Sequence, residues 1–206
     1  MDNEDLKFKK AMKELEKFVK ILEKDKKFNM SNNVFISIET TGINTAADKI
    51  VEIAALKIDK NNLKSLFHQI INPEKEIDKN ISNIIGYSNE ELKKYPKITE
   101  INERFINFIN SSTLIGHNND FIFSFLNKEL NVEISNEKLD VFEIAKKKYP
   151  NENNSTDNLK KKFNIIDNST FSSSLNEVLE LPKILDILSS KTKWNPNGHK
   201  RNFKKD

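Results

Sequence analysis

The stretch VFISIETTGINTAADKIVEIAALKI, residues 34–58, constrains the fold of this chain more than any other segment. An apolar run meets the tetrapeptide ETTG, which begins at Glu39, and a second alternating run follows. This pattern predicts a strand, a tight turn, a polar loop and a second strand, with a carboxylate at the end of the first strand. Side chains alternate along a strand, so the residue that shares a face with Glu39 two positions earlier is Ser37. We therefore ask whether Glu39 is part of a metal site that has lost a ligand.

The rest of the chain alternates helical and strand patterns. Residues 73–98 are expected to form a polar connection after Pro73. Three consecutive strands, followed by helices that alternate with strands, predict a mixed sheet covered by helices. The expected elements are a helix at 3–28, strands at 34–39, 49–59 and 63–72, a helix at about 99–110, a strand in STLIGHN, a helix at about 119–130, a short strand leading into Asp140, and helices near 141–148, 155–163 and 173–188.

Composition divides the chain into three parts: an N-terminal amphipathic helix within 1–30, a main domain at 33–190 and a basic tail at 191–206. The helix carries an apolar stripe, which fits either an extra helix packed on the domain or a docking site for a partner protein. The stripe consists of Phe8, Met12, Leu15, Val19 and Leu22. The tail has six Lys or Arg residues against Asp206, a net charge of +5 in a chain of net charge +3, and is expected to attract phosphate.

Several classes of protein are excluded. The 206 residues include no cysteine, which excludes disulfides and thiolate metal sites. No apolar run approaches the length that spans a bilayer, and the N-terminus MDNEDLKFKK lacks the apolar segment of a signal peptide. We expect a soluble cytoplasmic protein that does not enter a membrane.

Seven segments together identify a family resemblance. In order along the chain they are SIETTG, IVEIAALKI, FHQIINPEKEI, IIGYSNEEL, LIGHNNDFIFSFL, LDVFEIAKKKYP and NLKKKFNI. They resemble the DEDD-type 3′–5′ exonuclease family, in the histidine-base branch that includes the proofreading subunit of bacterial DNA polymerase III and ribonuclease T. The resemblance runs from about Val34 to Leu188. It implies an α/β fold, a ribonuclease-H-like five-stranded mixed sheet flanked by helices, here with an extra N-terminal helix.

The resemblance also implies a chemistry in which four carboxylates hold two divalent ions and a histidine acts as general base. Glu39 is the only family carboxylate that this comparison finds retained. The other carboxylate positions hold Ser37, Ile122 and Asn176, and Phe171 stands in place of the histidine. Shifting the last motif by one residue would instead place Glu177 at the carboxylate position and Ser172 at the base. Asp120 cannot replace Ile122, because two residues along a helix turn the side chain by about 200°.

Residues expected to face a nucleic acid surround these positions. The resemblance implies that Thr40, Thr41 and Gly42 form the turn whose backbone approaches the terminal nucleotide, with Gly42 permitting the close approach. His117 and Asn118 stand where the family contacts its substrate. An equally acceptable interpretation is that Asn118 caps the following helix. We expect His68 to be an ordinary edge or surface histidine.

The sequence therefore predicts a catalytically inactive exonuclease-fold module that binds single-stranded DNA or RNA ends, or acts as a scaffold, in a nucleic-acid-processing complex. No cofactor is expected, and Glu39 is at most a weak metal ligand. Two alternatives stay open. One is an active 3′–5′ exonuclease that uses Mg²⁺ or Mn²⁺ with rearranged ligands. The other is a structural subunit that only contacts proteins.

Overall fold

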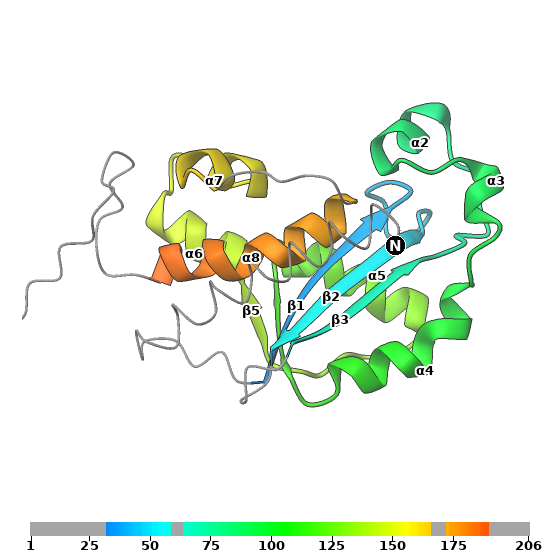
Figure 1. Cartoon of the computed structure of the whole chain (residues 1–206), viewed down its shortest axis with the longest axis horizontal. Helices are drawn as coiled ribbons and strands as arrows, with labels where there is room; N and C mark the ends of the chain where they lie inside the picture. Colours follow the sequence, from blue (N-terminus) through cyan, green and yellow to red (C-terminus); the bar gives the residue numbers. More distant parts are fainter. Residues whose placement is uncertain (1–31, 59–63, 166–171, 190–206) are drawn as a thin grey trace, which may run out of the picture.

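The computed structural model describes residues 32–58, 64–165 and 172–189 (Figure 1). The predicted strands 34–39, 49–59 and 63–72 are confirmed within two residues at either end, as is the helix predicted at 99–110. In chain order the elements are β1 (Asn33–Thr40), β2 (Ile50–Ile58), β3 (Lys64–Ile70), α2 (Lys79–Ile85), α3 (Asn89–Leu92), α4 (Ile98–Ile109), β4 (Thr113–Gly116), α5 (Asn119–Leu130), β5 (Lys138–Asp140), α6 (Val141–Lys148), α7 (Thr156–Lys162) and α8 (Ser173–Ser189).

The five strands form one mixed sheet in the order β3-β2-β1-β4-β5. β1 and β2 pair antiparallel, as do β2 and β3, whereas β4 runs parallel to both β1 and β5. This is the predicted sheet, because the consecutive strands 1–3 form hairpins and the later strands are reached through helical crossovers. β1 lies in the middle, so its C-terminal end is surrounded by structure on both sides.

Helices cover both faces of the sheet, and the alternation of β1 divides its side chains between two apolar clusters. Phe35 belongs to a cluster with α6, α7 and α8, whereas Ile36 and Ile38 belong to a second cluster with α4 and α5. Figure 1 shows α8 crossing one face of the sheet in front of β1 and β2. Ser37 and Glu39 share the face of Phe35 and therefore lie on the α8 side of the sheet.

The connection at 73–98 contains two short helices that the sequence pattern did not predict. The Asp78 side chain accepts hydrogen bonds from the amides of Asn80 and Ile81 at the start of α2, and Ser88 forms a capping box with Glu91 at the start of α3. Their apolar side chains fill a small cluster of their own, which has the buried members Val51, Ile70, Ile77, Ile85 and Leu92. Helices this short are stabilised by their caps and by this packing rather than by a long periodic stripe.

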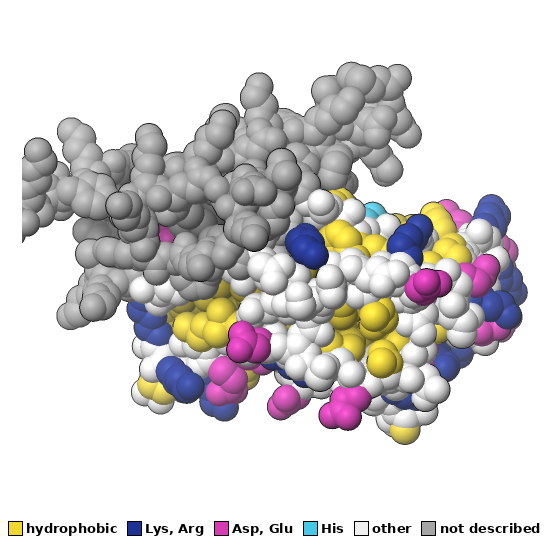
Figure 2. Space-filling view, turned by 90° about the horizontal axis from the view of Figure 1, so that it is seen from below, with side chains coloured by type: hydrophobic (Ala, Val, Ile, Leu, Met, Phe, Trp, Pro, Cys, Tyr) yellow, Lys and Arg dark blue, Asp and Glu magenta, His cyan; other side chains and the backbone are white. Residues whose placement is uncertain are grey.

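Three predictions concern segments outside the described residues: the helix at 3–28 with its apolar stripe, the tail at 191–206, and the position of Phe171. Within the described ranges, no helix is long and apolar enough to cross a membrane. Figure 2 shows the molecule from below, where the described part of the surface carries acidic and basic side chains side by side, with apolar side chains between them.

Candidate functional site

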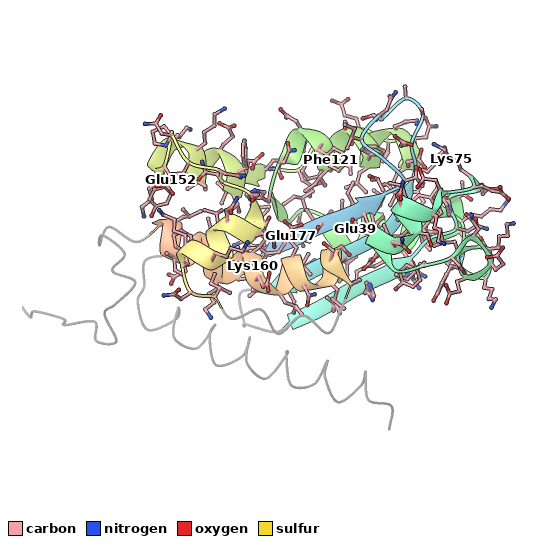
Figure 3. The ribbon with its side chains drawn as sticks, turned by 90° about the horizontal axis from the view of Figure 1, so that it is seen from above. Glu39, Lys75, Phe121, Glu152, Lys160 and Glu177 are labelled. Carbon is pink, nitrogen blue, oxygen red and sulfur yellow. The ribbon has the colours of Figure 1, made fainter. Side chains whose placement is uncertain are left out.

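Two glutamates face each other across the first hairpin. Glu39 of β1 is paired with Glu52 of β2 in the antiparallel register, so both side chains leave the sheet on the α8 side. Glu52 is 1% exposed although it is charged, and Glu39 is partly buried. Figure 3 places Glu39 between Glu177 of α8 and Lys75, at the end of β1.

Hydroxyl groups at the start of α8 bind Glu52. Ser172 and Ser174 both donate hydrogen bonds to Glu52 Oε1, the latter at 2.5 Å. His68 of the edge strand β3 places its Nε2 2.8 Å from the same oxygen. His68 is thus the edge histidine that the sequence predicted, with Glu52 as its partner. Within the described part of the chain, Glu52 Oε2 is buried and has no hydrogen-bond partner.

Glu177 connects three elements at the same end of the sheet. Its carboxylate accepts hydrogen bonds from the hydroxyls of Ser37 on β1 and of Thr156 at the start of α7, the latter at 2.6 Å. Glu177 and Ser37 lie 140 positions apart in the chain. Shifting the last motif by one residue places Glu177 at the family's carboxylate position, and in the structure Glu177 does contact Ser37.

The environment of Glu39 favours its neutral form. The pKa of Glu39 is raised from 4.5 to about 7, chiefly by burial and also by the negative charges of Glu52 and Glu177, against a hydrogen bond from Ser173 that lowers it. The Glu39 carboxyl therefore takes up a proton at a higher pH than an ordinary glutamate does. We call Ser37, Glu39, Glu52 and Glu177 the carboxylate cluster.

His117 and Asn118 lie at the junction of β4 and α5. Burial lowers the pKa of His117, against the opposing charges of Glu177 and Asp140, so the imidazole is neutral. Asn118 has a left-handed backbone, with φ of 72°, and its side chain makes no capping hydrogen bond. Asp140 caps α5 instead, because its carboxylate accepts from the amides of Asn118 at 3.1 Å and Asn119 at 2.7 Å. The capping role considered for Asn118 is therefore wrong.

Ile122 lies on the other side of the sheet from the carboxylate cluster. It is 3% exposed and belongs to the apolar cluster of α4 and α5. Its Cδ1 lies so close to β4 that a Cβ added to Gly116 would come within 2.7 Å of it. Asn176 lies in the first turn of α8, where its amide donates to the Ser172 carbonyl.

Sequence reasoning missed Glu52 as a member of the site. One signal was present: a glutamate in the middle of the apolar strand IVEIAALKI has to be buried, and a buried carboxylate needs partners. The partners themselves come from β3 and α8, so no local pattern could name them.

Comparisons with known proteins agree with this architecture. The sequence model of the family described as Exonuclease (RNase_T) matches residues 34–170. The chain belongs to this exonuclease family. The DNA polymerase III epsilon subunit of Buchnera aphidicola subsp. Baizongia pistaciae is 32% identical over 172 residues, covering 76% of this chain and 70% of that protein. The PolC-type DNA polymerase III of Thermotoga petrophila is also 32% identical, over 113 residues, but the match covers 55% of this chain and only 8% of that polymerase.

Solved structures show the same ribonuclease-H-like fold. Exonuclease I superimposes with a TM-score of 0.66 at 16% identity, covering 77% of this chain and 40% of that one. Exonuclease X, solved in complex with 5′-overhanging duplex DNA, gives a TM-score of 0.56 at 18% identity and covers 75% of this chain and 91% of that one. The fold predicted from the sequence is confirmed.

The family resemblance implies two divalent ions beside Glu39, and the residues present do not match that requirement. Mg²⁺ and Mn²⁺ need anionic oxygen ligands, but Ser37 and Asn176 are neutral and Glu52 Oε1 already accepts three hydrogen bonds. Ile122 offers no ligand atom. In the described ranges, no three His, Asp or Glu side chains are arranged to hold a metal ion.

Proposed function

We propose that this exonuclease-family chain is catalytically inactive and binds the ends of single-stranded DNA or RNA, or holds them within a nucleic-acid-processing complex. The carboxylate cluster carries this proposal. Its carboxylates accept hydrogen bonds from Ser37, Thr156, Ser172 and Ser174, and burial raises the pKa of Glu39 to about 7. Hydroxyl donors bind Glu177 and Glu52 Oε1, where cations would otherwise balance the carboxylate charge.

The turn after Glu39 supports the binding part of the proposal. Within the described residues, the amides of Gly42 and Ile43 donate no hydrogen bond, and the Ile43 side chain is 86% exposed. Free amides bind phosphate or hydroxyl oxygens, and an exposed apolar side chain offers a surface for a base. The hydroxyls of Thr40 and Thr41 are used inside the turn, because they donate to Gly42 O at 2.6 Å and Asp48 Oδ1 at 3.0 Å.

Nucleic-acid binding also agrees with the known relatives, which are named as polymerase subunits, and with exonuclease X, which was solved with DNA. The mixed charges in Figure 2 offer no continuous basic surface in the described part of that face. The phosphate contacts are therefore expected from the 191–206 tail in addition to the turn.

The test is a nuclease assay together with a binding assay on the full chain. With Mg²⁺ or Mn²⁺, a 5′-labelled single-stranded DNA or RNA should lose no nucleotides above background, and the same strand should bind in EDTA. Glu39→Ala should still show no digestion and should still bind the strand. Chelator-sensitive digestion that Glu39→Ala abolishes would overturn the proposal.

One observation favours the second candidate, an active exonuclease with rearranged ligands. Glu177 reaches Ser37, so Glu39, Glu52 and Glu177 gather three carboxylates at the end of β1. Crystals soaked in MnCl₂ separate the two candidates. Anomalous density beside Glu39 and Glu177, with digestion abolished in Glu177→Gln, would establish the enzyme, whereas no density and no digestion support the binding module.

A further inference from the structure

The loop between β1 and β2, residues 41–49, is organised around one carboxylate. Asp48 accepts hydrogen bonds from the Thr41 hydroxyl at 3.0 Å, the Asn44 amide at 2.9 Å and the Lys75 ammonium at 2.8 Å. The hydrogen bond from Lys75 contributes most to lowering the pKa of Asp48 below its ordinary value, so this side chain is ionised at neutral pH. The Asp48 side chain thus connects the beginning of the loop, the middle of the loop and a lysine from the β3–α2 connection.

Gly42 packs directly against this carboxylate. A Cβ at position 42 would lie 2.4 Å from Asp48 Oδ2 and 2.8 Å from its Cγ, distances that side chains do not tolerate. The glycine is therefore needed for the inner contact with Asp48, in addition to any approach of a nucleotide from outside.

Two lysines hold the far half of the loop from opposite sides. Lys75 also donates to the Ala47 carbonyl at 3.0 Å, while Lys128 of α5 donates to the carbonyl oxygens of Thr45, Ala46 and Asp48, the last two at 3.3 and 3.4 Å. A salt bridge of 2.9 Å between Lys49 and Glu129 adds a further tie to α5. The loop is thus fixed by charged groups, whereas the Ile43 side chain stays in solvent.

We propose that Asp48 is the positioning residue of this loop: anchored by Lys75, it holds Gly42 and Ile43 in the one arrangement that receives the end of a strand. The inference rests on the proposed function, since it assigns the residue that prepares the same site for binding. A loop that is already ordered loses less conformational entropy when it binds, and affinity rises accordingly. Asp48 itself need not touch the nucleic acid.

The experiment compares the full chain with its Asp48→Ala variant in EDTA, by two measurements. The first is hydrogen exchange at the amides of Asn44, Ala47 and Asp48, which are hydrogen-bonded inside the loop. In Asp48→Ala they should exchange about tenfold faster, with the core amides unchanged. The second is affinity for a linear thymidine oligonucleotide relative to a closed circle of the same length. Asp48→Ala should abolish the preference for the linear strand. A loss of protein stability alone would lower the affinity for the linear and the circular strand alike, and would leave the preference unchanged.

Three further variants sharpen the result. Lys75→Met should accelerate the exchange of the Ala47 and Asp48 amides. Added to Asp48→Ala it should remove only the remaining bond to the Ala47 carbonyl, so the two effects should be less than additive. Gly42→Ala should reproduce Asp48→Ala by displacing the carboxylate. Asp157→Ala is the matched control: Asp157 also pairs with a lysine, Lys160 at 3.3 Å, but on the exposed surface of α7, and it should leave both measurements unaltered.

The two measurements separate the outcomes. If the unaltered chain shows no preference for the linear strand, the proposed function fails, and the exchange data still decide whether Asp48 orders the loop. The positioning role is wrong if the loop amides of Asp48→Ala exchange as slowly as those of the unaltered chain. It is also wrong if the unaltered chain prefers the linear strand and Asp48→Ala keeps that preference.

Discussion

The 41–49 loop and the carboxylate cluster adjoin each other at the end of β1, yet the pKa of the acidic group is lowered in the loop and raised in the cluster. In the loop, a lysine ammonium lies against Asp48 and lowers its pKa. In the cluster, burial and two neighbouring glutamates raise the pKa of Glu39 to about 7, and the partners of the carboxylates are hydroxyls and the His68 ring. A salt bridge keeps a carboxylate charged, whereas a buried group of like charges takes up a proton.

This difference separates the two halves of the first motif by the charge state of their acids. The loop keeps its charge and its order at neutral pH, as a binding surface requires. In the cluster, protein hydroxyls and His68 already bind Glu52 Oε1, and hydroxyls bind Glu177, whereas a site for two divalent cations needs these oxygens free.

Glu39→Gln should give the largest change, and it should depend on pH. Because the pKa of Glu39 is raised from 4.5 to about 7, the folded protein holds a proton that the unfolded chain releases, so stability falls as pH rises through this window. The variant should unfold in urea with a free energy up to about 3 kcal/mol higher than the unaltered protein at pH 8, with little difference at pH 4.5.

The pH dependence that His117 contributes to stability has the opposite sign. Its pKa is lowered in the folded protein, so stability rises with pH until the pH reaches 6.5, the ordinary pKa of histidine. The unaltered protein and Glu39→Gln both contain His117, so the difference between their stabilities reports on Glu39 alone. Glu143→Gln makes the same charge change at a half-exposed side chain on α6, and as the control it should alter the free energy of unfolding by no more than about 0.5 kcal/mol. A constant difference between Glu39→Gln and the unaltered protein across pH would contradict the buried cluster.

Glu52→Ala should come next, with a loss of about 2–3 kcal/mol in the free energy of unfolding, measured by urea at pH 7. The change leaves the fully buried Ser174 hydroxyl, along with Ser172 and His68, without an acceptor. Glu52→Gln keeps an acceptor oxygen and should cost less. If Glu52→Ala were neutral, the hydroxyl donors at the start of α8 would not be holding the cluster together.

Ser37→Ala and Thr156→Val should each cost about 1 kcal/mol, because each removes one hydrogen bond to Glu177. The two losses should not add, since the hydroxyls share one carboxylate, and a double-mutant cycle from urea unfolding measures this coupling. Additive losses would mean that Glu177 does not connect β1 with α7.

Removing residues 191–206 should have the smallest effect on stability, within about 0.5 kcal/mol, and a specific effect on binding. If the lysine-rich tail contacts phosphates, its removal should make the slope of log affinity for single-stranded DNA against log salt shallower, by about 0.7 for each phosphate that the tail neutralises. Fluorescence anisotropy at several salt concentrations gives this slope. An unchanged slope would assign the phosphate contacts to the described domain.

Much of the fold could be predicted because its signals are local. The alternation in 34–58 predicted the first hairpin, and the order of later patterns predicted a mixed sheet with helices on it. The sequence did not predict α2 and α3, because helices of seven and four residues carry too little periodicity. Their capping residues, Asp78 and Ser88, resemble any polar loop residue. The abundance of lysine likewise gave no reason to single out Lys75 or Lys128, which hold the loop.

The sequence by itself determined that Ser37 and Glu39 share one face of a strand and that a glycine follows them in a turn, because strand alternation and backbone freedom are properties of neighbouring residues. Only the tertiary structure decided that Glu52 lies opposite Glu39 and that Glu177 bonds to Ser37, 140 positions away. Burial and the approach of like charges raise the pKa of Glu39, and they arise only when β2 pairs with β1 and α8 packs across the sheet.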